Sequence, residues 1–214
     1  MYTLPVLWLR KKRLRTNTSW SLRSTRFLII PPDSDIDMII KNKAIVADDW
    51  TVLRLQVQDT AEEIIVSAGK VIVPLKVWRA QRETLQQRKD IGVWLASDER
   101  AEDLKGDIQK FSVIAVDFPK FSDGRGYSIA YNLRARLGYK GELRAIGDVL
   151  RDQLFYMQRV GFDAFAPRPD RRIEDALKGL SDFSEVYQTS FDPALPLFRR
   201  TQRKGNSTAG TLND

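Results

Sequence analysis

The chain has 214 residues, which suits one domain with tails, and 43% of them are hydrophobic, which is enough for a buried core. It contains no Cys and no His, which excludes disulfides, Cys- or His-ligated metals, the usual haem ligands, iron–sulfur clusters and His-activated nucleophiles. No apolar stretch approaches the roughly 20 residues that a membrane-spanning helix needs, so we expect a cytoplasmic protein with no membrane span.

The net charge of +7 is concentrated at the N-terminus. Residues 1–32 contain seven Lys and Arg residues and no acid, and the remaining 28 basic residues are matched by 28 acidic ones. A groove that follows phosphates needs uncompensated basic side chains, so we expect no nucleic-acid binding through the globular part. We predict that residues 1–37 form a basic, disordered extension. It has the composition of a transit peptide, or it precedes a true start at Met38.

From Met38 onwards the pattern predicts a small β-hairpin, in which two short apolar runs flank the polar turn 41–43. Further along, short apolar strands alternate with helical segments. We predict strands that start at residues 71, 91, 112, 142 and 163, and helices over 78–88, 99–110, 126–137, 149–160 and 171–180.

Five consecutive βα units predict a single α/β domain over residues 38–190 with a parallel sheet. The sheet is either open or curved like part of a (βα) barrel, and we favour the curved form. Asp148 stands where a helix N-cap would lie, and Gly138 and Gly161 stand where C-terminal glycines would lie. Residues 191–214 are predicted to form a disordered tail.

The longest loop at the carboxyl ends of the predicted strands is 118–128. Ligands of parallel α/β folds bind at this edge. Gly124 and Gly126, with Arg125 between them, offer backbone N–H groups and a guanidinium to an oxyanion such as sulfite, sulfate or phosphate. The alternative is that Asp123 caps the helix while Arg125 pairs with a carboxylate. The predicted anion- or partner-binding residues are Lys120, Asp123, Gly124, Arg125, Gly126, Tyr127, Asp148 and Arg151.

Four carboxylates near the predicted strand ends are weak candidates for Mg²⁺ or Mn²⁺, namely Asp98, Glu99, Asp117 and Asp148. Helix capping is the commoner role for Asp at such positions, so we predict no metal site. Gly124 to Gly126 supplies only G-x-G, with Ile129 where the third Gly should stand and residues 118–123 before the first. This pattern excludes the standard dinucleotide fingerprint. No catalytic residue can be assigned, and the sequence leaves open whether a cofactor binds.

The segment DFPKFSDGRGYSIAYNLRARLGYKGELRAIGDVLRDQLFYMQRVGFDAF, residues 117–165, resembles the bacterial family called domain of unknown function 934. The segments MIIKNKAIVADDW, VIVPLKVW and IGVWLASDE are also similar to that family, so the resemblance covers residues 38–190. Because relatives begin near Met38, the resemblance implies that the basic extension is foreign to the family. Many relatives carry Cys where this chain has Val160, and we expect a packing role at that position.

The resemblance implies a link to sulfur assimilation. Family members are described as probable oxidoreductases involved in sulfite reduction, because their genes neighbour those of sulfite reductase. We therefore expect an accessory or binding protein that acts with sulfite reductase or its electron donor. The alternative is an oxidoreductase, or another enzyme that acts on a sulfur oxyanion or phosphate with Asp, Glu, Lys and Tyr chemistry and Mg²⁺.

Overall fold

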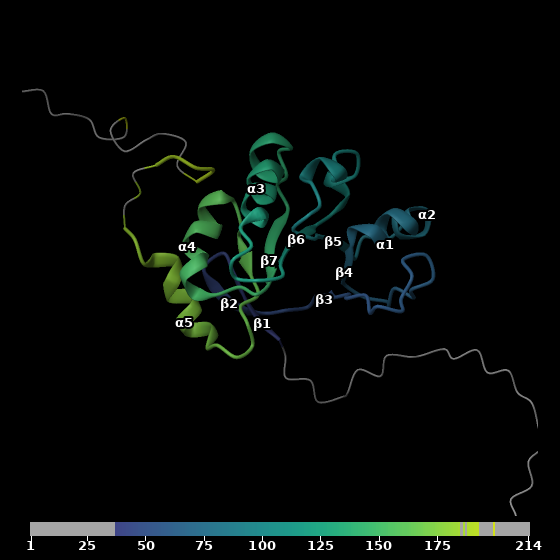
Figure 1. Cartoon of the computed structure of the whole chain (residues 1–214), viewed down its shortest axis with the longest axis horizontal. Helices are drawn as coiled ribbons and strands as arrows, with labels where there is room; N and C mark the ends of the chain where they lie inside the picture. Colours follow the sequence, from purple (N-terminus) through teal and green to yellow (C-terminus); the bar gives the residue numbers. More distant parts are fainter. Residues whose placement is uncertain (1–36, 185, 187, 193–198, 200–214) are drawn as a thin grey trace, which may run out of the picture. The chain divides into compact units, whose positions relative to one another are not determined.

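The computed structural model describes residues 37–184, 186, 188–192 and 199 (Figure 1). The predicted N-terminal extension therefore lies outside the described residues except for Asp37, and so does most of the predicted C-terminal tail. Among the helices that are described, none has the length and apolar character needed to cross a membrane.

Within the described residues, eight strands form one sheet in the order β2-β1-β8-β7-β6-β5-β4-β3. Six of them run parallel and in chain order, with their bounds at Thr51–Val52 (β3), Val71–Pro74 (β4), Ile91–Leu95 (β5), Val113–Phe118 (β6), Glu142–Gly147 (β7) and Ala164–Phe165 (β8). The sheet curls into a half-barrel (Figure 1). The predicted parallel sheet and its curvature are confirmed.

The predicted hairpin is confirmed as β1 (Met38–Lys41) and β2 (Ala44–Ala47), which pair antiparallel. β1 also pairs antiparallel with β8, so the hairpin extends the sheet beyond the last parallel strand. Asn42 and Lys43 form the turn with positive φ, a conformation that Asn adopts more readily than most residues. The N–H of Asn42 donates to the carbonyl oxygen of Asp163 at 2.9 Å, which fixes the hairpin at the start of β8.

The helices follow the predicted order but are shorter and less regular than predicted. Their bounds are Leu75–Ala80 (α1), Arg82–Leu85 (α2), Arg125–Tyr131 (α3), Arg151–Val160 (α4) and Ile173–Lys178 (α5). α3 continues as a π-helical turn over Asn132–Arg136, and a 3-10 turn, Gly179–Ser181, follows α5. The predicted helix over 99–110 is wrong. Two 3-10 turns, Ala101–Leu104 and Ile108–Lys110, replace it because Gly106 and Asp107 interrupt the chain between them.

The main core lies between the helices and the outer face of the sheet. It contains alternate residues of the strands, such as Val116 and Leu143, together with Leu133 of the α3 extension and Met157 of α4. Because the crossovers between successive parallel strands have the same hand, α1 to α4 lie on this one face. α5, which follows the last parallel strand, packs against the same core through Ala176. The strands themselves are rich in Val, Ile and Ala and are buried on both sides, as parallel strands commonly are.

A smaller core covers the concave face and consists of Ile72, Val113, Ala115 and Ile146, with Trp50 and Trp94 packed against them. The stretch before β4 divides between the two cores, because Trp50 and Val52 pack against the smaller core while Leu53, Leu55 and Ile64 pack against the main one. The indole N–H of Trp94 donates to the carbonyl oxygen of Leu53 at 2.9 Å, which ties this stretch to β5.

Candidate functional site

The loops that follow β5, β6, β7 and β8 lie at one edge of the sheet, because these strands are parallel. We call this edge the carboxyl edge. It holds the segments 96–100, 119–124, 148–150 and 166–170. Most of the predicted site residues belong to these segments.

Asp123, Arg125 and Ser97 form a hydrogen-bonded cluster between two of these loops. Arg125 donates from Nε and Nη2 to the two carboxylate oxygens of Asp123 at 2.9 and 2.7 Å, and Nη2 also donates to Ser97 Oγ at 2.8 Å. The Arg125 guanidinium, together with Ser97, holds the pKa of Asp123 well below its usual range. The Arg125 side chain is 62% exposed, and its ion pair with Asp123 fixes the direction of the guanidinium.

The two glycines of this loop have different roles. A Cβ on Gly126 would lie 2.7 Å from the ring of Phe118, so Gly126 lets α3 approach the end of β6 closely. Gly124 has a φ of −84°, and a Cβ there would meet only the Tyr127 ring at 3.7 Å, an ordinary contact. The need for a glycine at position 126 is thus explained by packing.

The backbone of Phe121 is held on both sides. Its N–H donates to Asp148 Oδ2 at 2.7 Å, and its carbonyl oxygen accepts from Gln153 Nε2 at 3.0 Å. Arg168 in turn donates to Asp148 Oδ1 at 3.1 Å. The Phe121 side chain is 49% exposed, so a rigid backbone presents an aromatic ring to solvent.

Asp148 is thus a support of the 119–124 loop, and its predicted role as an N-cap is wrong. The N-cap of α4 is Leu150, whose N–H donates to Oε1 of Gln153 at 3.1 Å. Gly147 has a φ of +92°, and a Cβ added at this position would lie 2.5 Å from the carbonyl oxygen of Phe118. This glycine turns the chain at the end of β7 and directs Asp148 towards the loop.

The other predicted residues divide between the loop and its surroundings. Lys120 is exposed beside Phe121. Tyr127 packs its ring against Phe118 and Tyr156 at centroid distances of 5.3 and 5.1 Å, and burial raises the pKa of its phenol. Arg151 does not join the cluster, because it donates to Asp182 Oδ1 at 3.0 Å beyond α5.

The strand-end carboxylates are dispersed rather than gathered. Asp117 accepts from Arg54 at 2.7 Å, Asp98 is exposed, and Glu99 accepts the N–H of Ala96 at 2.7 Å. Burial raises the pKa of Glu99. In the part of the chain that the structure describes, there is no group of three or more carboxylates placed to hold a metal ion.

Gly161 and Gly138 lie at the C-terminal ends of helical segments, as predicted. Gly161 ends α4 with a φ of +113°, and Gly138, with a φ of +67°, follows the α3 extension. Val160 is the last residue of α4 and only 4% exposed, which agrees with the expected packing role.

The fold and this edge together define an α/β half-barrel protein whose 119–124 loop is braced from two neighbouring loops. The family model described as bacterial protein of unknown function (DUF934) matches residues 92–198, half of the 214-residue chain. The chain belongs to this family. No curated protein and no solved structure matches it.

Proposed function

We propose that this protein is an accessory protein of assimilatory sulfite reduction that binds sulfite reductase or its electron donor through the loop 120–127. The observation that carries the proposal is the exposed ring of Phe121 on a backbone fixed by Asp148 and Gln153. The process in the proposal, sulfite reduction, is taken from the description of family members as probable oxidoreductases involved in sulfite reduction.

The loop has the composition of a protein-docking surface. Aromatic and Arg side chains carry a large share of the binding energy in protein interfaces. Here Phe121 lies between Lys120 and Arg125 in the chain, and all three are exposed. We infer that the partner offers an apolar pocket with acidic residues at its rim. Because the loop is already ordered, binding costs little conformational entropy.

The same contacts favour protein binding over a small oxyanion at this loop. Asp123 already accepts two hydrogen bonds from the Arg125 guanidinium, so a sulfite or sulfate ion would have to compete with it. They also favour a binding role over catalysis, because Asp117, Asp123 and Asp148 each lie in an ion pair with an arginine. We place the role in the cytoplasm, which the lack of Cys supports.

Growth on different sulfur sources tests the proposed process. Deleting the gene in the bacterium that carries it is expected to abolish growth on sulfate and to spare growth on sulfide or cysteine, which enter after sulfite reduction. Expression of the wild-type chain from a plasmid should restore growth on sulfate. Equal growth of the deletion strain on sulfate and on sulfide would refute the proposal.

A further inference from the structure

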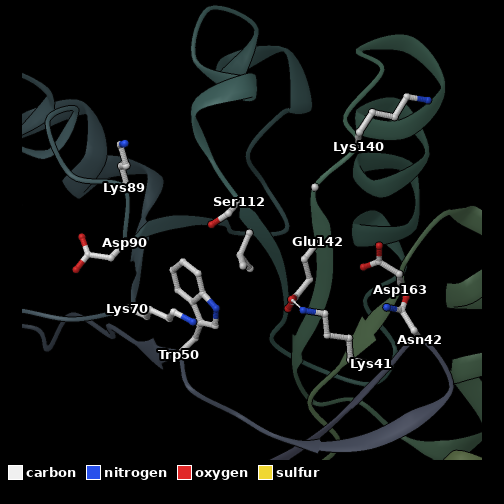
Figure 2. A pocket seen from close by; sticks show the side chains of 12 residues that line it. Lys41, Asn42, Trp50, Lys70, Lys89, Asp90, Ser112, Lys140, Glu142 and Asp163 are labelled. Atoms are coloured by element: carbon white, nitrogen blue, oxygen red, sulfur yellow. Dashed lines mark ion pairs between the residues drawn. The ribbon is translucent and has the colours of Figure 1, made fainter.

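A pocket of about 540 Å³ lies at the opposite edge of the sheet, where the parallel strands begin (Figure 2). Its walls come from residues just before β4, β5, β6 and β7, from the start of β8 and from the end of β1. The indole of Trp50 forms part of its lining. A volume of this size falls in the range of sites for small organic ligands and far exceeds that of a single tetrahedral ion.

The three carboxylates of the pocket already have cationic partners. Glu142 pairs with Lys41 and with Arg144, both at 2.7 Å. Asp90 accepts from Arg88 at 2.9 and 3.0 Å.

The third carboxylate, that of Asp163, also has a cationic partner. Asp163 accepts from Arg134 at 2.7 Å and from the N–H of Leu143 at 2.8 Å. The negative charge of the pocket is therefore neutralised by the protein itself.

Apart from the Asn42 side-chain amide, which both donates and accepts, the polar lining side chains without a partner in the described residues are hydrogen-bond donors. Within the described residues, no carboxylate pairs with Lys89 or Lys140, and no acceptor lies in hydrogen-bonding reach of the Trp50 indole N–H or the Ser112 hydroxyl. Lys70, the other lysine of the lining besides Lys41, is paired with Asp49. Figure 2 shows Ser112 between Lys89 on one side and Lys140 on the other. The pocket thus carries two uncompensated positive charges and at least four free donors.

We propose that this pocket binds a small molecule that carries a phosphate or sulfate group on an apolar, ring-bearing body. The terminal oxygens of such a group accept a hydrogen bond from Ser112, and the positive charges of Lys89 and Lys140 flank it from opposite sides. The body lies along Trp50, whose indole supplies apolar surface beside the N–H donor. A phosphate or sulfate ester directs three terminal oxygens to different sides, whereas the two oxygens of a carboxylate lie in one plane.

Binding of simple phenyl esters tests this proposal. We expect phenyl phosphate or phenyl sulfate to shift the NMR signals of the Trp50 indole N–H and of the Lys89, Ser112 and Lys140 amides. The ester that binds more tightly shows whether the site prefers a phosphate or a sulfate group. Phenol and inorganic phosphate or sulfate should bind at least about tenfold more weakly, because each supplies only half of the ligand.

Variants separate this pocket from the carboxyl edge. The double variant Lys89→Gln/Lys140→Gln should weaken ester binding at least about tenfold, and both side chains are exposed, so the fold should survive. Lys105→Gln, an exposed lysine outside the pocket, and Phe121→Ala should bind the ester as the wild type does. The proposal is overturned if neither ester shifts these signals, if the double variant binds unchanged, or if an inorganic ion binds as tightly as its ester.

Discussion

Arg144 is a large, charged side chain that lies inside the half-barrel with 1% of its surface exposed. It donates from Nη1 to both oxygens of Asp48 at 2.9 and 2.7 Å and from Nε to Glu142 at 2.7 Å. Lys41 at the end of β1 completes this group through Glu142. A buried charge is tolerated only when it is paired and hydrogen-bonded, and Arg144 meets both conditions.

Replacing Arg144 by Met should destabilise the protein strongly. The change leaves Asp48 without its cation and Glu142 with only Lys41, and the loss of one partner costs about 3–5 kcal/mol in comparable buried pairs. Urea unfolding should therefore show a large fall in the free energy of unfolding. Arg136→Met, at an exposed position of the α3 extension, is the matched control and should change it by less than about 0.5 kcal/mol. A similar, small loss in both variants would contradict this account of the concave face.

Residue patterns alone do not reveal such partners. Glu142 and Arg144 alternate with Leu143 and Ala145, a pattern that equally fits a strand with one solvent-exposed face. Their true environment depends on Asp48, which lies 96 residues from Arg144 in the chain. The role of Phe121 was missed for the same reason, because its supports lie about 30 residues further along.

At the scale of elements, Asp107 connects three neighbouring segments. Its carboxylate accepts from Arg82 of α2 at 2.9 and 2.6 Å, from Trp78 of α1 at 3.2 Å, and from Lys110 of the following 3-10 turn at 2.9 Å. The predicted long helix over 99–110 does not form, and this carboxylate instead anchors the irregular segment that takes its place.

These contacts make the stability contribution of Asp107 depend on pH. Chiefly the hydrogen bonds from Arg82 lower the pKa of Asp107 well below the ordinary value of 3.8. The folded state thus favours the ionised form, so the contribution is complete above about pH 5 and is lost as the pH falls through 3.8 and below.

Asp107→Asn should therefore cost about 2 kcal/mol at neutral pH, the scale of a hydrogen bond to a charged group. The difference in free energy of unfolding between wild type and variant should shrink as the pH is lowered from 6 towards about 2. Urea titrations of both proteins across this range measure it. A difference that stays constant with pH would show that the ionised carboxylate has no special role.

The positions of the main parallel strands were accessible from the sequence because each is a short apolar run buried on both faces. Val71–Pro74 and Ile91–Leu95 begin at the predicted residues. β3 was missed because it has only two residues, and it forms only because β4 lies beside it. The hairpin was predicted, but its pairing with β8 could not be, since nothing local in β1 specifies that partner.

For the whole molecule, the parallel arrangement separates two chemically different edges. The carboxyl edge presents the braced loop with Phe121 and Arg125, and the opposite edge presents the pocket with Lys89 and Lys140. The protein partner and the small anionic ligand that we propose would therefore bind to different groups.

Partner binding by a single loop variant tests the central claim most directly. In calorimetric titrations with purified sulfite reductase and, separately, with its electron donor, one of the two should bind the wild-type protein. Phe121→Ala should weaken that binding about 30-fold, as expected for an interface hot spot worth about 2 kcal/mol. Tyr131→Ala, an exposed aromatic residue at the far end of α3, should leave it unchanged. Binding of neither partner, or equal affinity of Phe121→Ala and the wild type, would contradict the account.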